Sequence, residues 1–329
     1  MNQDRPAQDR HTPVLLERVV DLVRPVLSTS EDLMVDATLG MGGHSERILE
    51  CCPQARVVGI DRDPQALDLA RRRLARFGER FTAIHAVYDE VPDVLAELQW
   101  GQAQAVLFDL GVSSLQLDDL DRGFAYRADA PLDMRMDQQQ GPTAAEVLNT
   151  YGQSDLERVL RDFGEERFAR KIARAIVRQR DVVAFERSGA LVDLLSATIP
   201  AASQRSGGHP AKRTFQALRI EVNQELSVWH RALPNVLDIL PTGGRVAVLA
   251  YHSLEDRITK RALAAGASSS APPGFPVELP EQRPWLRLLT RGAEKATPQE
   301  IAENPRAASV RLRAAERIRP TASTGKTSR

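Results

Sequence analysis

Short apolar runs alternate with helical patterns along the first 110 residues of the chain. Runs at 33–37, 56–60, 81–86 and 105–110 are bounded by polar residues or glycine and predict β-strands. Helical patterns lie between them at 45–50 and 64–77, where Pro64 suits a first helical turn behind Asp63 as a cap. This alternation predicts βαβ units and a parallel, doubly wound sheet, which is an α/β fold.

The pattern changes between residues 137 and 208. Segments 143–149, 154–163, 165–180 and 188–199 have helical patterns and predict an inserted, smaller, all-helical domain. A strand pattern returns at 245–250 after a Pro-Thr-Gly-Gly turn, and 286–290 with 309–314 could form a closing antiparallel pair. We therefore assign 1–137 and 209–329 to the sheet domain and 138–208 to the helical domain.

Composition limits the class of protein. A hydrophobic fraction of 42% in 329 residues can form a sizeable core, and no apolar run is long enough for a membrane span. The first ten residues are polar and lack the apolar stretch of a secretory signal, so we expect a cytoplasmic protein without a membrane partner. Cys51 and Cys52 are adjacent, which suits neither a disulfide nor a zinc site, and no metal site is expected.

A net charge of zero hides an asymmetry along the chain. Residues 210–329 contain 19 Lys and Arg but only 11 Asp and Glu. A basic C-terminal third suits a nucleic-acid partner. An ordinary solvated surface with a basic tail explains the charge equally well.

The strongest local signal is the segment from Asp36 to Ser45, in which an apolar strand runs into a Gly-rich turn and a helix. Glycines let the backbone approach a ligand closely, and the helix start offers free N–H groups. The G-x-G-G order differs from the G-x-G-x-x-G of dinucleotide-binding turns, and a Walker lysine is absent. Asp61, at the end of the second strand, can accept both ribose hydroxyls of an adenosine, which serves NAD and S-adenosylmethionine alike. The turn favours S-adenosylmethionine; the alternative is that Asp61 only caps a helix.

Two further strands end in polar residues. Asp109 follows the strand at 105–110, and ligands of open α/β sheets bind beyond such strand ends. A loop cap is the alternative for its carboxylate. The strand at 245–250 leads into a cluster of His, Ser and carboxylates at 252–256. A hydrolase triad would need a G-x-S-x-G elbow, and a metal site would need a recognised ligand spacing; both are missing.

Taken together, these motifs resemble the RsmH (MraW) family, the small-subunit ribosomal RNA cytidine N(4)-methyltransferases. The matching stretches follow the family's order from residue 11 to past residue 306. They are His11–Leu16, Asp36–Ser45, Gly59–Pro64, Phe108–Leu117, Arg122–Phe124, Pro131–Asp137, Phe163–Phe168, His209–Ala211, Thr214–Ile220, His252–Lys260 and Asn304–Arg306.

The resemblance implies a Rossmann-like, S-adenosylmethionine-dependent methyltransferase domain interrupted by a helical domain. We expect this insertion to recognise RNA. It also implies the cofactor-binding residues, which are Gly42, Gly43, His44, Asp61, Tyr88, Asp109 and Gln116. Tyr88 would pack on the adenine, where the family more often has Phe. Leu115 stands where the family usually has proline, which weakens the assignment of Gln116. Tyr251 replaces a Phe before His252.

The implied reaction moves a methyl group from a sulfonium to the exocyclic amine of a cytidine in the decoding region of 16S rRNA. Asp109, or a backbone carbonyl of Leu110 or Gly111, is the expected proton acceptor. His252, Ser253 and Asp256 rank second, as groups that hold the base or the methionine end of the cofactor.

We expect the partner to be 16S rRNA within the small ribosomal subunit. The expected phosphate contacts are Arg219, Arg257, Lys260 and Arg306, although a surface ion pair is the alternative for each. Two other functions stay open: a ribosome-assembly factor that binds the cofactor without methyl transfer, and an aminomethyltransferase with a DNA acceptor. The oligomeric state, monomer or homodimer, also stays open.

Overall fold

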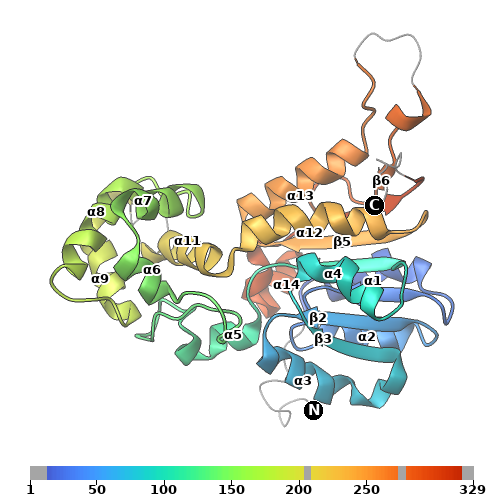
Figure 1. Cartoon of the computed structure of the whole chain (residues 1–329), viewed down its shortest axis with the longest axis horizontal. Helices are drawn as coiled ribbons and strands as arrows, with labels where there is room; N and C mark the ends of the chain where they lie inside the picture. The colour runs from blue at the N-terminus through green and yellow to red at the C-terminus, as the bar shows by residue number, and fades with distance from the viewer. Residues whose placement is uncertain (1–12, 204–208, 273–278, 321–329) are drawn as a thin grey trace, which may run out of the picture. The chain divides into compact units, whose positions relative to one another are not determined.

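The computed structural model describes residues 13–203, 209–272 and 279–320 (Figure 1). His11 and Thr12 of the first family motif lie outside these residues. The chain forms two compact units, Met1–Gly111 with Val228–Arg329, and Val112–Ser227. We call them the sheet unit and the helical unit. No helix in the described ranges combines the length and hydropathy needed to cross a bilayer.

The sheet unit is built on seven strands in the order β3-β2-β1-β4-β5-β7-β6. Strands β1 to β5 pair in parallel, whereas β7 lies antiparallel between β5 and β6. The α/β class, the parallel sheet and the closing antiparallel pair are thus confirmed. The strands are β1 Leu33–Asp36, β2 Arg56–Asp61, β3 Phe81–His85, β4 Ala105–Asp109, β5 Arg245–Ala250, β6 Leu286–Leu288 and β7 Arg311–Arg317.

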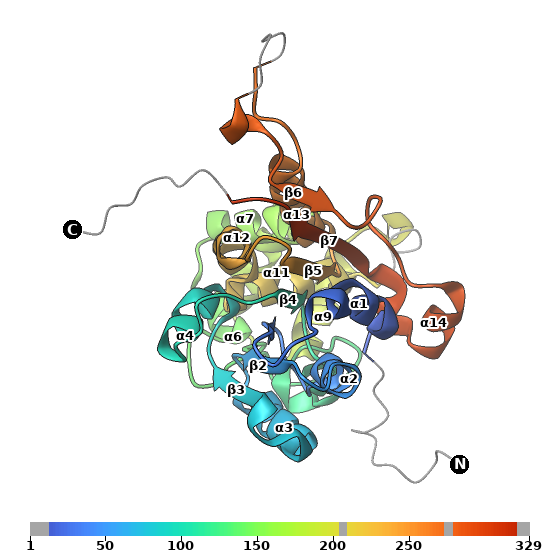
Figure 2. The same cartoon turned by 90° about the vertical axis from the view of Figure 1, so that its right-hand side faces the viewer.

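Helices cover both faces of this sheet (Figure 2). Alternate strand residues point to opposite faces, so Met34 packs with α1–α3 while Leu33 and Val35 pack with α4, α12 and α13. The helices of this unit are α1 Leu16–Val23, α2 Gly43–Cys51, α3 Pro64–Leu74, α4 Val91–Glu97, α13 Ser253–Gly266 and α14 Pro298–Glu303; α12 Glu225–Ile239 begins in the helical unit and continues into this one. Cores on both faces hold the strand ends in fixed positions.

The helical unit has its own core. It contains α5 Ser114–Asp118, α6 Ala144–Thr150, α7 Gln153–Asp162, α8 Ala169–Arg180, α9 Ser188–Thr198 and α11 Ala211–Asn223. Its boundaries at 112 and 227 are wider than the 138–208 expected from the sequence. The physical reason is that Phe124, Leu132 and Met134 of the preceding loop and Phe215 and Leu218 of α11 are buried in the helical core.

The carboxyl ends of four neighbouring parallel strands lie along one edge of the sheet. There β1 ends at Asp36, β2 at Asp61, β4 at Asp109 and β5 at Ala250. The chain passes from β1 to β2 on one side and from β4 to β5 on the other, so the strand order reverses between β1 and β4. Such a reversal is where open α/β sheets bind ligands.

Candidate active site

The turn after β1 is held by a buried hydrogen bond. The Ser45 hydroxyl donates to Asp36 Oδ2 at 2.7 Å, and Asp36 is 1% exposed. Gly40 and Gly42 have left-handed φ angles of 52° and 78°, which glycine adopts without strain. A Cβ at Gly40 would meet nothing within 4 Å, whereas one at Gly43 would lie 2.4 Å from Pro13 Cγ. The turn is therefore open at Gly40 and closely packed at Gly43.

Asp61, at the end of β2, supports this turn from the side. Its Oδ2 accepts from the Gly40 N–H at 2.7 Å and its Oδ1 accepts from the Asp63 N–H at 2.9 Å. Each carboxylate oxygen can accept a second hydrogen bond. Asp61 can thus hold the turn and a pair of vicinal hydroxyls at the same time, while the helix cap is supplied by Asp63, which accepts from the Gln65 N–H.

Asp109 is fixed at the end of β4 by three neighbours. The Tyr251 hydroxyl donates to Asp109 Oδ1 at 2.7 Å, and the Asp109 N–H donates to Thr38 Oγ1 at 2.6 Å. Asp109 Oδ2 lies 3.8 Å from His44 Nδ1. A quarter of the Asp109 side chain remains exposed. The carboxylate is therefore oriented through one oxygen and still reachable by a ligand.

His44, in the first turn of α2, faces this carboxylate from the other side. Its Nε2 lies 3.1 Å from the Val14 carbonyl, which can only accept, so Nε2 carries the proton. Burial lowers the pKa of His44, although the Asp36 carboxylate opposes this. A neutral imidazole with its Nδ1 lone pair toward Asp109 follows.

The electrostatics of this edge favour a cationic ligand. Burial raises the pKa of Asp36 and of Asp61 to about 6 and the pKa of Asp109 to about 7. Three carboxyl groups that are costly to ionise together would be stabilised in their charged form by a positive charge nearby. A sulfonium with an α-ammonium group and a ribose supplies that charge and the two hydroxyls. The residues present therefore fit S-adenosylmethionine.

Two expected cofactor residues have other contacts in the structure. Tyr88 follows β3 in a short 3₁₀ turn, Tyr88–Glu90, and its half-buried ring packs edge-on against Phe108 and Trp229. Gln116 belongs to the helical unit, where it is 4% exposed. Its side chain accepts from the Ser113 N–H at 3.0 Å in a capping box, so the loop is held although Leu115 replaces a proline.

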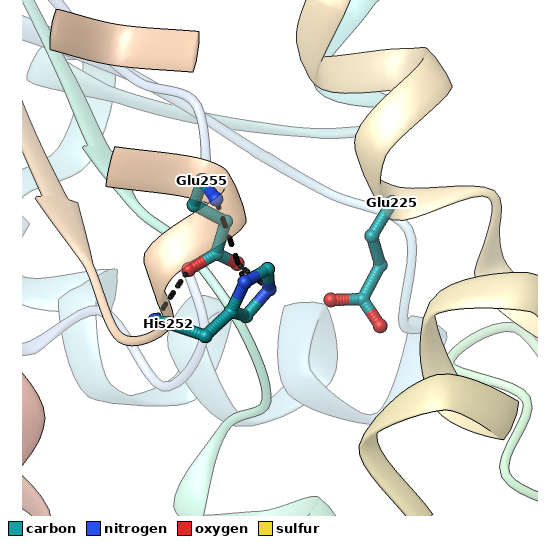
Figure 3. Close-up of side chains that lie close together, drawn as sticks. All are labelled: Glu225, His252 and Glu255. Carbon is teal, nitrogen blue, oxygen red and sulfur yellow. Dashed lines mark hydrogen bonds and ion pairs between the residues drawn. The ribbon is translucent and has the colours of Figure 1, made fainter. Parts of the chain in front are cut away.

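The polar cluster after β5 forms the start of α13 (Figure 3). His252 is the N-cap; its Nδ1 accepts from the Glu255 N–H at 3.4 Å, and Glu255 Oε2 accepts from the His252 N–H at 3.2 Å. Glu255 Oε2 also accepts from the Tyr251 N–H at 2.8 Å. Ser253, the first residue of α13, is half-buried. This cap fixes the backbone next to the Tyr251 side chain.

Asp256 is committed to an ion pair. Arg313 Nε donates to Asp256 Oδ1 at 2.7 Å, and Arg311 Nη1 donates to Oδ2 at 3.2 Å. Burial would raise the pKa of Asp256, but the two guanidinium groups hold it below its ordinary value. Because it stays ionised and paired, its geometry suits anchoring α13 to β7 rather than accepting a proton.

The four residues expected to touch phosphates differ in their surroundings. Arg219 makes a two-fold hydrogen bond with Glu225, at 2.8 and 2.9 Å. Arg257 and Lys260 are exposed on α13, three residues apart, and Arg306 is half-buried. Of these, Arg219 has the contacts of a structural ion pair.

Two residues of the site were not assigned a role from the sequence. Thr38 accepts a hydrogen bond from the backbone N–H of Asp109, and Tyr251 donates one to the Asp109 carboxylate. For Tyr251 a signal existed, because a tyrosine in place of phenylalanine adds a hydroxyl at a strand end next to the site.

Comparison with protein families identifies the reaction to which this site belongs. The model of the MraW methylase family matches residues 8–318. The chain belongs to the MraW methylase family. It is an S-adenosylmethionine-dependent methyltransferase with a Rossmann-like fold, as its motifs predicted.

Close relatives cover nearly the whole chain. The ribosomal RNA small subunit methyltransferase H of Beutenbergia cavernae is 61% identical over 318 residues, which are 97% of this chain and 96% of the relative. The protein of the same name from Nocardioides sp. is 63% identical over 307 residues, 93% of this chain and 96% of the relative. That from Saccharopolyspora erythraea is 61% identical over 313 residues, 95% of each.

Proposed function

We propose that this enzyme transfers a methyl group from S-adenosylmethionine to the N(4) amine of a cytidine in the decoding region of 16S rRNA, within the small ribosomal subunit. The names of the relatives support a substrate in small-subunit ribosomal RNA. The observation that carries the chemistry is Asp109, a partly exposed carboxylate with a pKa raised to about 7 at the reversal point of the sheet. An enzyme with this substrate works in the cytoplasm, where ribosomal subunits are assembled.

The cofactor would be held by residues of the sheet unit. Asp61 has free lone pairs for the ribose hydroxyls, and the open backbone at Gly40 lets a ligand approach the turn. Gly42, Gly43 and His44 form the start of α2 beside that turn, and Tyr88 offers an aromatic ring after β3. Bound there, S-adenosylmethionine supplies an electrophilic methyl carbon on a positively charged sulfur.

Asp109 then acts on the methyl acceptor, the cytidine, by removing a proton from its amine. The exocyclic amine of cytidine would form the new N–C bond as the methyl–sulfur bond breaks. The electrons of the broken bond would stay on the sulfur, which leaves as a neutral thioether, while the nitrogen becomes positive. Asp109 Oδ2, which is not used by Tyr251, accepts the proton that this nitrogen releases and later returns it to water. A base works best when its pKa lies near the working pH, and burial brings the pKa of Asp109 to about 7. His252 positions Tyr251 through the cap of α13 that it forms with Glu255, Ser253 begins that helix, and Asp256 ties the helix to β7.

Recognition of the RNA is the proposed role of the helical unit, with 138–208 as its expected centre. Arg257, Lys260 and Arg306 remain proposed phosphate contacts of the sheet unit. For Arg219 we propose an indirect role, because its guanidinium orders the start of α12 through Glu225. The target base must leave its stack to reach Asp109.

The test uses methyl-labelled S-adenosylmethionine and small subunits from cells that lack the enzyme. The RNA is digested and its nucleosides are identified. We expect label in N(4)-methylcytidine, lost by more than about a hundredfold with Asp109→Asn, which keeps the shape of the side chain but cannot accept the proton. Asp238→Asn is the matched control, since Asp238 is exposed near the end of α12, which leads to the opposite edge of the sheet.

The outcomes separate the parts of the proposal. Label in another nucleoside would refute the cytidine acceptor. No label, although the cofactor binds, would favour an assembly factor. Label in duplex DNA at comparable rates would favour a DNA acceptor. Full activity of Asp109→Asn would refute Asp109 as the base while leaving the acceptor in place.

A further inference from the structure

Helix α8 of the helical unit carries an unusual charge pattern. Its residues 169–180 include five basic side chains and no acidic one. The helix contacts α6, α7 and α9, and it buries Ile172, Ala173 and Ile176 against them. The basic side chains therefore belong to its remaining faces.

Two of the five basic residues have structural contacts. The Lys171 ammonium donates to the Thr198 carbonyl at 2.6 Å. Arg180 donates to the carbonyls of Leu148 and Tyr151 at 2.8 and 2.6 Å. Both tie α8 to neighbouring segments of the helical unit.

The other three, Arg170, Arg174 and Arg178, are exposed. No described residue forms a hydrogen bond or ion pair with any of their guanidinium groups. They recur every four residues, so they form one row along the helix. We call this row the arginine row. It is about 12 Å long, which spans on the order of three phosphates of a nucleic-acid strand.

Two other exposed arginines of this unit are paired with carboxylates. Arg161 lies 3.0 Å from Asp162 and 3.8 Å from Glu157, and Arg187 lies 2.6 Å from Asp129. The three arginines of the row, in contrast, have no acidic partner among the described residues, and they follow one another along a single helix.

The row does not help the helix to form. Like charges four residues apart repel each other, and Arg170 lies in the first turn, where the helix dipole disfavours a positive side chain. A surface shaped only by stability would contain acidic residues at such positions. The charge is thus better explained by an anionic partner.

We infer that the arginine row on α8 binds the phosphate backbone of the ribosomal RNA substrate. The inference rests on the proposed function, because it takes the RNA of the small subunit as the partner. Guanidinium groups match phosphate oxygens in charge and hydrogen-bond geometry, and contacts to the backbone fix orientation without reading sequence. The row would therefore orient the substrate rather than select the cytidine.

The experiment compares the wild-type protein with the variant Arg170→Gln/Arg174→Gln. Glutamine keeps a long polar side chain and a good helix propensity while it removes the charge. The matched control is Arg71→Gln/Arg72→Gln, two exposed arginines in the last turn of α3 in the sheet unit. Binding of each protein to small subunits lacking the methyl group is measured at several salt concentrations.

We expect the α8 variant to bind the subunits roughly tenfold more weakly or worse near 0.1 M salt. The slope of log affinity against log salt should become less steep by about 1.4 to 1.8, since two phosphate contacts are lost. The control variant should keep the wild-type affinity and slope. Binding of S-adenosylmethionine alone, followed by calorimetry, should be equal in all three proteins and shows that the variants are folded.

An α8 variant with the wild-type affinity, or one that loses affinity at an unchanged salt slope, would overturn the inference. A similar loss in the control would also overturn it, because the effect would then reflect general charge. These outcomes are independent of the acceptor. If binding depends on the row but no N(4)-methylcytidine forms, the proposed function fails and the arginine row stands.

Discussion

The hydrogen bond from Tyr251 to Asp109 gives the sharpest test of the active site. The phenol donates to Asp109 Oδ1 at 2.7 Å and so stabilises the charged carboxylate. Burial raises the pKa of Asp109 to about 7, and this hydrogen bond opposes that rise. The change Tyr251→Phe removes only the hydroxyl and keeps the ring beside Gly111.

The magnitude follows from the strength of the bond. Hydrogen bonds to charged groups contribute about 1.5–3 kcal/mol. One pKa unit corresponds to about 1.4 kcal/mol, so the pKa of Asp109 should rise by about 1 to 2 units in the variant. The base would then be deprotonated in a smaller fraction of molecules, and the methylation rate at pH 7 should fall by about 5- to 50-fold.

The assay is the pH dependence of kcat/KM for methyl transfer to small subunits, from about pH 6 to pH 10. The wild-type acid limb should lie near pH 7 and that of Tyr251→Phe about 1 to 2 pH units higher. At the alkaline end the two rates should converge. Tyr151→Phe is the control, because its hydroxyl also donates to a carboxylate, that of Glu221 at 3.0 Å, in the helical unit. A variant whose rate falls equally at every pH would refute the reasoning.

Three further outcomes are expected. The variant Asp256→Asn should lose about 2 kcal/mol of unfolding free energy in urea, because Arg313 loses its charged partner, yet keep the acid limb of the pH profile; a moved limb would make Asp256 a base. The change Gly42→Ala places a Cβ 2.9 Å from Leu74 Cδ1 at a left-handed φ, so calorimetry should show weaker S-adenosylmethionine binding, and unchanged affinity would contradict this. Three carboxyl groups at the ends of β1, β2 and β4 have folded pKa values above their unfolded ones, so the unfolding temperature of the free enzyme should fall as pH rises from about 5 to 8. His44, with its pKa lowered, works in the opposite direction below about pH 6.5; a rising curve would show that it dominates.

The elements with clear periodicity were predictable from the sequence. The strands that build the sheet were placed to within a few residues, because each is a short apolar run with polar ends. Helix α8 begins at Ala169 rather than at 165, since Glu165 has a left-handed φ of 48° that a helix cannot contain. Strand β7 begins at Arg311 rather than at 309, because Pro305–Ser309 forms a 3₁₀ turn.

The boundaries of the helical unit were harder to predict from the sequence. Residues Phe124, Leu132 and Met134 are spaced without a helical or strand period, so their burial in the helical core has no local signature. The roles of polar residues were hard to predict for a similar reason, because they depend on contacts between residues far apart in the sequence. Asp256 pairs with two arginines more than 50 residues away, and that pairing exists only because β7 returns beside β5.

The order of strands in the sheet also determines how the chain can fold as it is made. Strand β5 pairs with β4, yet 135 residues separate the end of β4 from the start of β5. At about 5–20 residues per second, β4 waits roughly 7 to 27 s on the ribosome for its neighbour. The helical unit is continuous in sequence and lies within that interval. Synthesis therefore completes the helical unit before the sheet unit that surrounds it in sequence. The edge of β4 that pairs with β5 stays without its partner strand until residues 245–250 have emerged.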